Sequence, residues 1–261
     1  MWERRYGLLT PTRTDGGHRV YGADDVARVK ALLQLMESGL PVGAAVAELS
    51  ERPAEPDADA HELFAEAWTA ADALDPLGFR RAVAEAVTSL GPPRGLDAVV
   101  APLLRRMGDE WRASPRNVAR EHLASMIVRS YLLEQLAAMV RGSGPRALGF
   151  CPEGELHDIG LVMAGVALAD AGWLPLVLGA ETPLATIDVL VGELRPDAVV
   201  VASQRRGPAL RFLDRWTPPP KTAIVLGGGG FLPEDAQRFR RCVVYAGAFA
   251  ELAGAMSATS R

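Results

Sequence analysis

Apolar positions recur at steps of three and four residues over residues 60–140, a segment rich in Ala, Leu, Val and Arg. This period is that of α-helices that bury one face. Three breaks interrupt the pattern, near Asp75-Pro76, Gly91-Pro-Pro93 and Ser114-Pro115. Because proline lacks the N–H that a helix interior requires, each break separates two helices. We therefore predict a four-helix bundle over residues 59–141.

After Gly142-Ser-Gly-Pro145 the pattern changes to short apolar runs that alternate with amphipathic segments. The runs cover residues 147–150, 174–178, 198–202, 223–226 and 242–245. Short continuous apolar runs are typical of strands buried on both faces, and strands that alternate with helices form a parallel sheet. We predict that residues 145–261 form a five-stranded, parallel, doubly wound, Rossmann-like α/β domain.

Composition restricts the function. The chain has 261 residues, 49% of them hydrophobic, which is enough for two or three modules. Its net charge of -4 excludes a globally basic nucleic-acid binder, so any nucleic-acid contact must come from a local patch. The two cysteines, Cys151 and Cys242, predict neither a disulfide framework nor a Cys-rich metal site. With no signal sequence and no uninterrupted apolar span, we expect a soluble, cytoplasmic protein.

A histidine lies on the loop between the first predicted strand and the next helix, in the sequence Cys151-Pro-Glu-Gly-Glu-Leu-His-Asp-Ile-Gly160. The Glu155 carboxylate can hold one ring nitrogen of His157 and leave the other free as a metal ligand. Gly160 allows the backbone to approach a bulky group. A lone loop histidine is most often simply solvated, so the neighbouring motifs decide between the two interpretations.

Two further motifs follow strands of the same sheet. Ser203 follows the third predicted strand, and four glycines, residues 227–230, follow the fourth. The carboxyl ends of parallel strands form the binding edge of such a sheet. A phosphate-binding loop is an alternative for the glycines, but the sequence lacks Gly-x-x-x-x-Gly-Lys-Ser/Thr, and the glycines do not follow the first strand.

These motifs resemble the cobalamin-binding domain shared by methionine synthase, corrinoid mutases and cobalamin-dependent regulators. Its signature is Asp-x-His-x-x-Gly, then Ser-x-Leu, then Gly-Gly. The resemblance implies that His157 displaces the cofactor's dimethylbenzimidazole and ligates cobalt from the lower face. The displaced tail would lie beside the serine and the glycines. On this basis the cofactor-binding residues in this domain are Glu155, His157, Asp158, Gly160, Ser203, Gly227, Gly228 and Gly229.

The chain departs from this signature at two positions. Glu155 replaces the usual aspartate, and Arg205 stands where the leucine would be. Glutamate keeps the hydrogen-bond acceptor with a longer reach, so we expect little effect on the histidine. Arg205 leaves the binding of the tail open.

The helical segment adds a second group of candidates. Trp111 ends the third predicted helix, and Glu121 and His122 lie in the second turn of the fourth. A tight connection between these helices would bring the three side chains near one another. Alone, such a tryptophan is more often part of the core, and a Glu-His pair is usually solvated.

Together with the downstream motif, Trp-x9-Glu-His resembles the MerR-type, adenosylcobalamin-dependent photoreceptor repressors of the CarH kind. The resemblance covers nearly the whole chain. It implies that Trp111 packs over the adenosyl group on the upper face, and that Glu121 and His122 help to enclose it. In light-responsive members a histidine that directly follows this tryptophan ligates cobalt after photolysis. Here that position is Arg112, which does not ligate metals. His122 or water would then occupy the site.

The amino-terminal 21 residues resemble the end of a MerR recognition helix and its wing. Four arginines oppose two acidic residues there, a local balance of +2. Such arginines suit phosphate contacts and insertion into a groove. The candidate DNA-binding residues are Arg4, Arg5, Tyr6, Arg13, Arg19 and Tyr21.

Two helices, residues 24–36 and 41–49, would pack behind the wing, and a proline-rich linker, residues 50–58, would follow. The family has a first helix and a turn ahead of Trp2, so we expect residues 1–49 to be a partial, amino-terminally truncated MerR winged-helix module. Operator binding would then depend on a complete helix-turn-helix upstream.

The resemblance as a whole implies a transcriptional regulator and not an enzyme. The holo-protein would form a homo-oligomer in the dark, a tetramer, and bind operator DNA, and photolysis of the cobalt–carbon bond would disassemble it. Two alternatives stay open. One is a corrinoid-binding protein of a methyl-transfer system, which would have no wing. The other is a cobalamin sensor that acts through protein partners without DNA.

Overall fold

The computed structural model describes residues 12–13, 19–20, 58–140, 142–219 and 222–259. The chain divides into two compact units, residues 1–55 and 56–261. In the first unit, β1 (Thr12–Arg13) pairs with β2 (Arg19–Val20) as an antiparallel two-stranded sheet, with Arg13 opposite Arg19. The other candidate DNA-binding residues, both helices predicted behind the wing and nearly all of the predicted linker lie outside the described residues.

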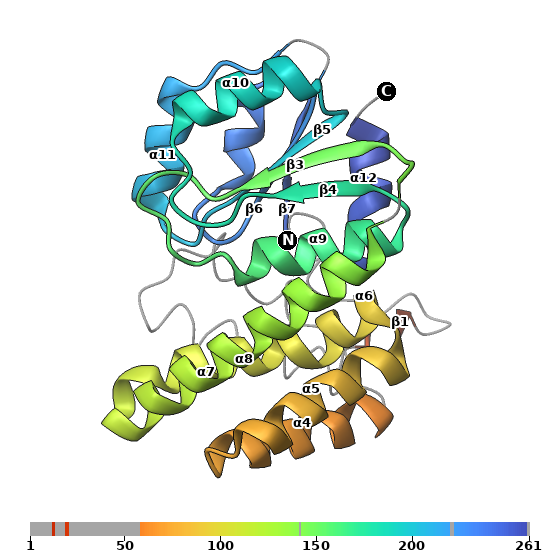
Figure 1. Ribbon diagram of the computed structural model, residues 1–261, viewed down its shortest axis with the longest axis vertical. Helices are drawn as coiled ribbons and strands as arrows, with labels where there is room; N and C mark the ends of the chain where they lie inside the picture. The colour runs from red at the N-terminus through yellow and green to blue at the C-terminus, as the bar shows by residue number, and fades with distance from the viewer. Residues whose placement is uncertain (1–11, 14–18, 21–57, 141, 220–221, 260–261) are drawn as a thin grey trace. The chain divides into compact units, whose positions relative to one another are not determined.

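The second unit begins with the predicted helices (Figure 1). They are α4 (Ala58–Asp72), α5 (Pro76–Leu90), the consecutive segments α6 (Pro92–Gly95), η1 (Leu96–Val100) and α7 (Ala101–Glu110), and then α8 (Pro115–Met139). The boundaries follow the predicted proline breaks, and side chains cap two of them. The Asp75 carboxylate accepts the N–H groups of Leu77 and Gly78, and the Ser114 hydroxyl accepts that of Asn117.

The third predicted helix contains a turn that the sequence pattern did not indicate. Segment η1 is a π-helix, in which the N–H of Ala101 donates to the carbonyl of Leu96, five residues earlier. Pro102 follows directly and has no N–H to donate to the preceding turn. A single π turn accommodates this missing bond without ending the helix.

The five predicted strands are confirmed. They are β3 (Arg146–Phe150), β4 (Leu174–Val177), β5 (Ala198–Ala202), β6 (Ala223–Gly227) and β7 (Cys242–Tyr245). They form one parallel sheet in the order β4-β3-β5-β6-β7. The chain moves to one side of β3 for β4 and to the other side for β5, so the topological switch point lies between β3 and β5.

Helices cover both faces of this sheet. They are α9 (Ile159–Asp170), α10 (Leu184–Leu194), α11 (Arg206–Arg215) and α12 (Leu252–Thr259), with the short turns η3 (Pro233–Arg238) and η4 (Phe249–Glu251). One core lies against α10 and α11, and another against α9 and α12. The predicted doubly wound class is therefore correct.

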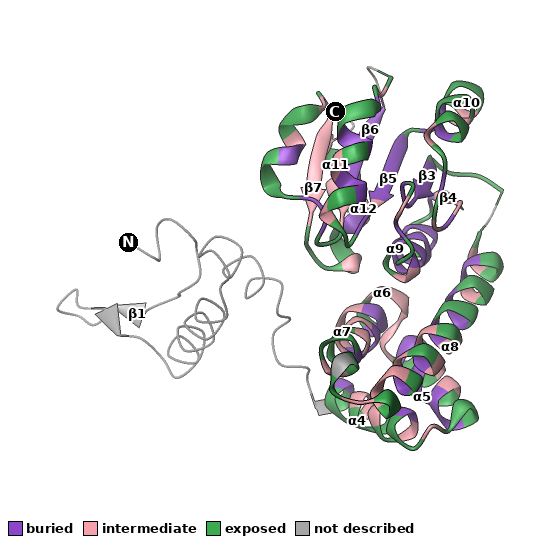
Figure 2. Ribbon diagram, turned by 90° about the vertical axis from the view of Figure 1, so that its left-hand side faces the viewer, coloured by how far each residue is buried: buried purple, intermediate pink, exposed green. Residues whose placement is uncertain are grey.

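Helix α9 belongs to two cores at once. Leu161 and Leu168 pack with the sheet, whereas Val162, Met163 and Val166 pack with the helical bundle. A helix that is apolar all round is buried all round, which explains why the described part of α9 is mostly buried (Figure 2). The bundle and the α/β layer are thus one packed unit. No helix in the described part of the chain has the length and apolar character needed to cross a membrane.

Candidate functional site

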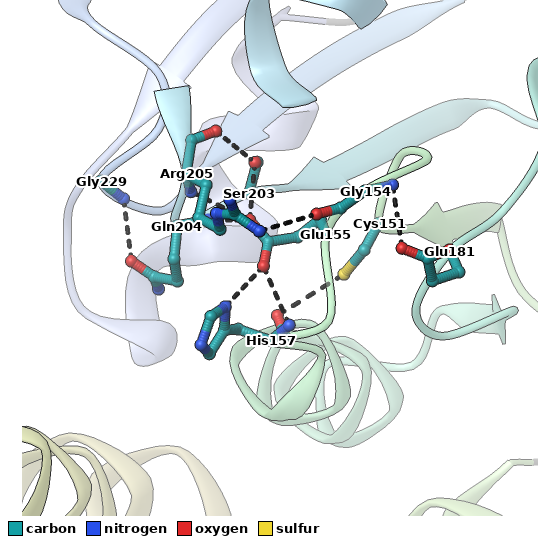
Figure 3. Close-up of polar contacts among 9 residues, drawn as sticks. All are labelled: Cys151, Gly154, Glu155, His157, Glu181, Ser203, Gln204, Arg205 and Gly229. Atoms are coloured by element: carbon teal, nitrogen blue, oxygen red, sulfur yellow. Dashed lines mark hydrogen bonds and ion pairs between the residues drawn. The ribbon is translucent and has the colours of Figure 1, made fainter. Parts of the chain in front are cut away.

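The carboxylate of Glu155 joins two loops at the carboxyl edge of the sheet (Figure 3). Its Oε1 accepts the backbone N–H of His157 at 2.9 Å and lies 2.6 Å from His157 Nδ1. Its Oε2 accepts the Ser203 hydroxyl at 2.9 Å and the N–H groups of Gln204 and Arg205 at 2.8 and 2.9 Å. The loop after β3 and the loop after β5 are therefore connected across the switch point.

These hydrogen bonds determine the charge of Glu155. The side chain is fully buried, and burial raises its pKa. The hydrogen bonds from His157, Arg205 and Ser203 outweigh burial and lower the pKa to about 2. The ionised carboxylate can only accept hydrogen bonds, so Nδ1 of His157 must carry the proton that faces it. In the neutral imidazole the lone pair is then on Nε2.

The Nε2 side of the ring faces open space. The His157 side chain is 64% exposed, and Figure 3 shows the ring directed away from the strands. Leu156 beside it is 66% exposed, and a Cβ placed on Gly160 would have no atom within 4 Å. The imidazole, the Leu156 side chain and the Gly160 backbone are therefore all exposed on this loop.

The loop that carries His157 is braced by the loop after β4. The backbone of Cys151 exchanges hydrogen bonds with Gly179 and Thr182, each at 2.9 Å. The Glu181 carboxylate accepts the N–H of Gly154 at 3.0 Å, and the N–H of Glu181 donates to the Glu155 carbonyl at 3.1 Å. Glu181 lies in no sequence motif and was not among the predicted site residues.

The Cys151 thiol lies beneath this loop and donates to the His157 carbonyl at 3.6 Å. It is fully buried, and burial together with the neighbouring carboxylates raises its pKa to about 12. A thiol that stays protonated at neutral pH is a poor metal ligand. Among the described residues, no three His, Cys, Asp or Glu side chains gather as a metal site. A metal at His157 would therefore need most of its ligands from elsewhere, as cobalt has in a corrin.

The glycines at the end of β6 pack against Ser203, at the carboxyl edge of the sheet where the sequence predicted both motifs. Ser203 donates its N–H to the Gly227 carbonyl at 3.0 Å and accepts that of Gly230 at 2.8 Å. Gly228 has a φ of +88°, and a Cβ there would lie 2.5 Å from the Ser203 carbonyl oxygen. The Gly229 N–H donates to the Gln204 side chain at 3.1 Å. Because Gly229 and Gly230 donate within the protein, their N–H groups do not form an open phosphate cradle.

Asp158 faces the bundle. Its side chain is 6% exposed, and the carboxylate accepts hydrogen bonds from the guanidinium of Arg129 on α8, with Nε 3.0 Å from Oδ1 and Nη2 2.8 Å from Oδ2. This carboxylate is therefore engaged in an interhelical ion pair, and its predicted contact with the cofactor stays a prediction.

The bundle candidates are exposed to different extents. Trp111 begins η2 (Trp111–Ala113) and is 37% exposed, so it is not fully buried in the core. The Glu121 carboxylate lies 2.7 Å from Nδ1 of His122 and accepts the Ser125 hydroxyl at 2.6 Å. The His122 side chain is 69% exposed. Glu121 thus contacts Nδ1 of His122, as Glu155 contacts Nδ1 of His157.

Helix α8 meets the residue after His157 through Arg129. Arg129 meets Asp158 at the start of α9, and Leu136 packs where Gly165 leaves space, so the two helices run in the same direction. The part of α8 before Arg129 consequently extends past the start of α9 (Figure 1). His122 lies two turns before Arg129 on the same face, about 10 Å further along the axis. His122 thus lies on the amino-terminal part of α8, beyond the contact of Arg129 with Asp158.

Comparisons with known proteins identify both parts of the chain. A family model for MerR HTH family regulatory proteins matches residues 1–51, and a B12 binding domain model matches residues 63–132. The monomethylamine corrinoid protein of Methanosarcina barkeri has the same fold, with a TM-score of 0.55 over 77% of this chain and 98% of that chain, at 16% identity.

Two relatives resemble most of the chain. The HTH-type transcriptional repressor CarA of Myxococcus xanthus is 36% identical over 207 residues, which are 78% of this chain and 70% of CarA. The repressor CarH of the same organism is 34% identical over 229 residues, 83% of this chain and 77% of CarH. The predicted family is thereby confirmed: the chain belongs to the MerR-type, cobalamin-binding transcriptional repressors related to CarA and CarH.

Proposed function

We propose that this repressor uses adenosylcobalamin as a light-sensitive ligand, with His157 as the lower cobalt ligand. The observation that carries the proposal is the geometry of His157. Glu155 holds its Nδ1 at 2.6 Å, and the ring is 64% exposed. A fixed tautomer with a free, solvent-facing Nε2 is what a metal ligand requires.

The residues around His157 fit a corrinoid. Leu156 and Gly160 leave an open, partly apolar surface beside the imidazole. Ser203, Gly227, Gly228 and Gly229 are the positions proposed to lie beside the nucleotide tail. When bound, the cofactor supplies a cobalt ion that accepts the imidazole nitrogen and, in its adenosyl form, a light-labile cobalt–carbon bond.

The bundle would cover the upper face. We assign this role to Trp111, whose partly exposed ring can pack on the adenosyl group, and to Glu121 and His122. Without the adenosyl group, Trp111 would border a void, and packed proteins do not tolerate voids of that size without moving. His122 or water would occupy the position next to cobalt after light, because residue 112 is an arginine.

The output would be a change in assembly. A dark homotetramer would present several DNA-binding modules at once, and avidity would make its operator affinity much higher than that of one module. On the wing, Arg13 and Arg19 are cross-strand neighbours, and we propose that they contact DNA together with Arg4, Arg5, Tyr6 and Tyr21. The methyl-transfer alternative is not favoured, since CarA and CarH are both repressors.

The test combines light with assembly. The full chain is purified in the dark with adenosylcobalamin, and its mass in solution and its binding to promoter DNA are measured before and after green light. We expect an oligomer that forms only with the cofactor. In light it should dissociate and release the DNA. Binding of the cofactor without any change in mass or DNA affinity after light would contradict the light response.

A further inference from the structure

The bundle contains a buried cation, Arg120 on α8. The side chain is only 5% exposed, although arginine is seldom buried. One Nη lies 2.7 Å from the Asp72 carboxylate on α4, and the other lies 2.5 Å from the Glu110 carboxylate on α7. Nε has no hydrogen-bond partner. A charge in this position is costly to bury, and its two carboxylates compensate for it.

The same cluster includes an aromatic ring and a second arginine. The guanidinium carbon of Arg120 lies 4.4 Å from the centroid of the Trp68 ring, and that of Arg106 lies 3.7 Å from it. The Nε of Arg106 is 3.2 Å from Glu110 Oε1, so each oxygen of Glu110 has its own arginine. We refer to Trp68, Asp72, Arg106, Glu110 and Arg120 as the Trp68 cluster.

The position of this cluster in the chain is its informative property. Glu110 directly precedes Trp111, and Arg120 directly precedes Glu121 and His122. The Glu110 carbonyl also accepts the side-chain N–H of Asn117 on α8 at 2.8 Å. One residue is therefore fixed to α8 by both its side chain and its backbone, immediately before the tryptophan that the proposed function places over the cofactor.

A buried ion pair such as that of Arg120 is weak evidence for a role in stability alone. Buried ion pairs can often be replaced by apolar side chains of similar size without loss of stability. The guanidinium of an arginine is planar, so its N–H groups fix the positions of the carboxylates that they bind. Here the guanidinium holds the end of α7 against the second turn of α8. These two segments carry the upper-face candidates.

We propose that Glu110 and Arg120 are positioning residues that set the spacing between Trp111 and the pair Glu121-His122, and thereby the preference for adenosylcobalamin over forms with a small upper-face group. This inference rests on the proposed function. The Trp68 cluster does not touch the cofactor; it acts through the turn that holds Trp111.

The test compares two cobalamins in the dark. Dissociation constants for adenosylcobalamin and hydroxocobalamin are measured with the full chain, Glu110→Gln and Glu134→Gln. The control breaks an interhelical pair of the same bundle, Arg80 with Glu134 at 2.7 Å, which is exposed and not adjacent in sequence to any upper-face candidate. For Glu110→Gln we expect weaker adenosylcobalamin binding by about tenfold and unchanged hydroxocobalamin binding. The control, Glu134→Gln, should keep the ratio of the two dissociation constants found for the unmodified protein.

The outcomes separate this inference from the proposed function. If the ratio of the dissociation constants for adenosylcobalamin and hydroxocobalamin is the same in the unmodified protein and in Trp111→Ala, the proposal that Trp111 covers the adenosyl group is wrong. If Trp111→Ala loses the preference but Glu110→Gln keeps it, or weakens both cobalamins equally, the positioning role is wrong. Should Glu110→Gln fail to fold, Arg120→Lys keeps the charge and loses the fork, and the same loss of preference is expected from it.

Discussion

Arg129 and Asp158 form a two-pronged ion pair between the bundle and the residue that follows His157, with Nε 3.0 Å from Oδ1 and Nη2 2.8 Å from Oδ2. Asp158 also precedes the first residue of α9, whose apolar side chains pack with both the bundle and the sheet. The ion pair therefore links the loop of the proposed lower ligand to the helix that carries His122, beside the apolar packing of α8 on α9.

Replacing Arg129 should lower the stability of the protein more than breaking an exposed surface ion pair does. In Arg129→Met the Asp158 carboxylate, 6% exposed, loses its cation. Arg129 is itself 46% exposed, which reduces the loss. We expect the free energy of unfolding to fall by about 2 kcal/mol, measured by urea denaturation. Asp158→Asn in the same chain should restore part of it. An equal effect from Arg80→Met, which breaks an exposed pair, would contradict this account.

Glu155→Gln should disturb the site without changing its size. Five hydrogen-bond donors converge on the two carboxylate oxygens, and an amide offers only one oxygen to them. We expect cobalamin affinity to fall by about tenfold or more, since the orientation of the ligand is lost. Glu153→Gln, on the exposed part of the same loop, is the control. Titrations followed by absorbance would show whether the two variants differ, and equal affinities would refute the assignment.

The glycine loop offers a comparison between adjacent residues. Gly228→Ala requires a Cβ 2.5 Å from the Ser203 carbonyl oxygen at a φ of +88°, whereas the nearest atom to a Cβ at Gly227 is 4.0 Å away. We expect Gly228→Ala to lower stability by about 2 kcal/mol or more and Gly227→Ala to have a much smaller effect. Thermal unfolding of both variants checks this, and similar melting temperatures would contradict the packing described.

The ion pair of Arg206 with Asp235 predicts a pH dependence. Burial raises the pKa of Asp235, but hydrogen bonds from Arg206 and from the N–H of Leu232 outweigh it and lower the pKa below its usual value. Its contribution to stability is therefore complete above the unfolded pKa, about 4, and is lost as the pH falls through the lower folded value. The stability difference between the unmodified protein and Asp235→Asn should shrink from pH 7 to pH 3. A constant difference would exclude this titration. Glu234→Gln, an exposed neighbour, should follow the unmodified protein throughout.

The sequence pattern predicted the strands well because buried parallel strands are continuous apolar runs with turn residues at both ends. It also predicted that Glu155 holds His157 and that Ser203 lies at the same edge. It did not predict that one carboxylate binds both loops, since Glu155 and Ser203 are separated by 48 positions and local spacing carries no signal for that contact.

The Trp68 cluster was missed for a related reason. An arginine in an amphipathic helix normally points to solvent, and nothing in the residues around Arg120 distinguishes it from Arg116 or Arg129. Its burial depends on Asp72 and Glu110 from two other helices, which only the tertiary structure brings together. The burial of α9 on both sides is easier to predict from the sequence, because the helix is apolar on every face.

The most direct test of the central claim is electron paramagnetic resonance of the one-electron-reduced holo-protein, prepared with ordinary and with nitrogen-15 histidine. If His157 is the lower ligand, the nitrogen splitting of the cobalt lines should change from triplets to doublets with the labelled protein, and His157→Ala should lose this label-dependent splitting. A splitting that the histidine label does not alter would show that the cofactor's own base is the ligand, and would contradict the account.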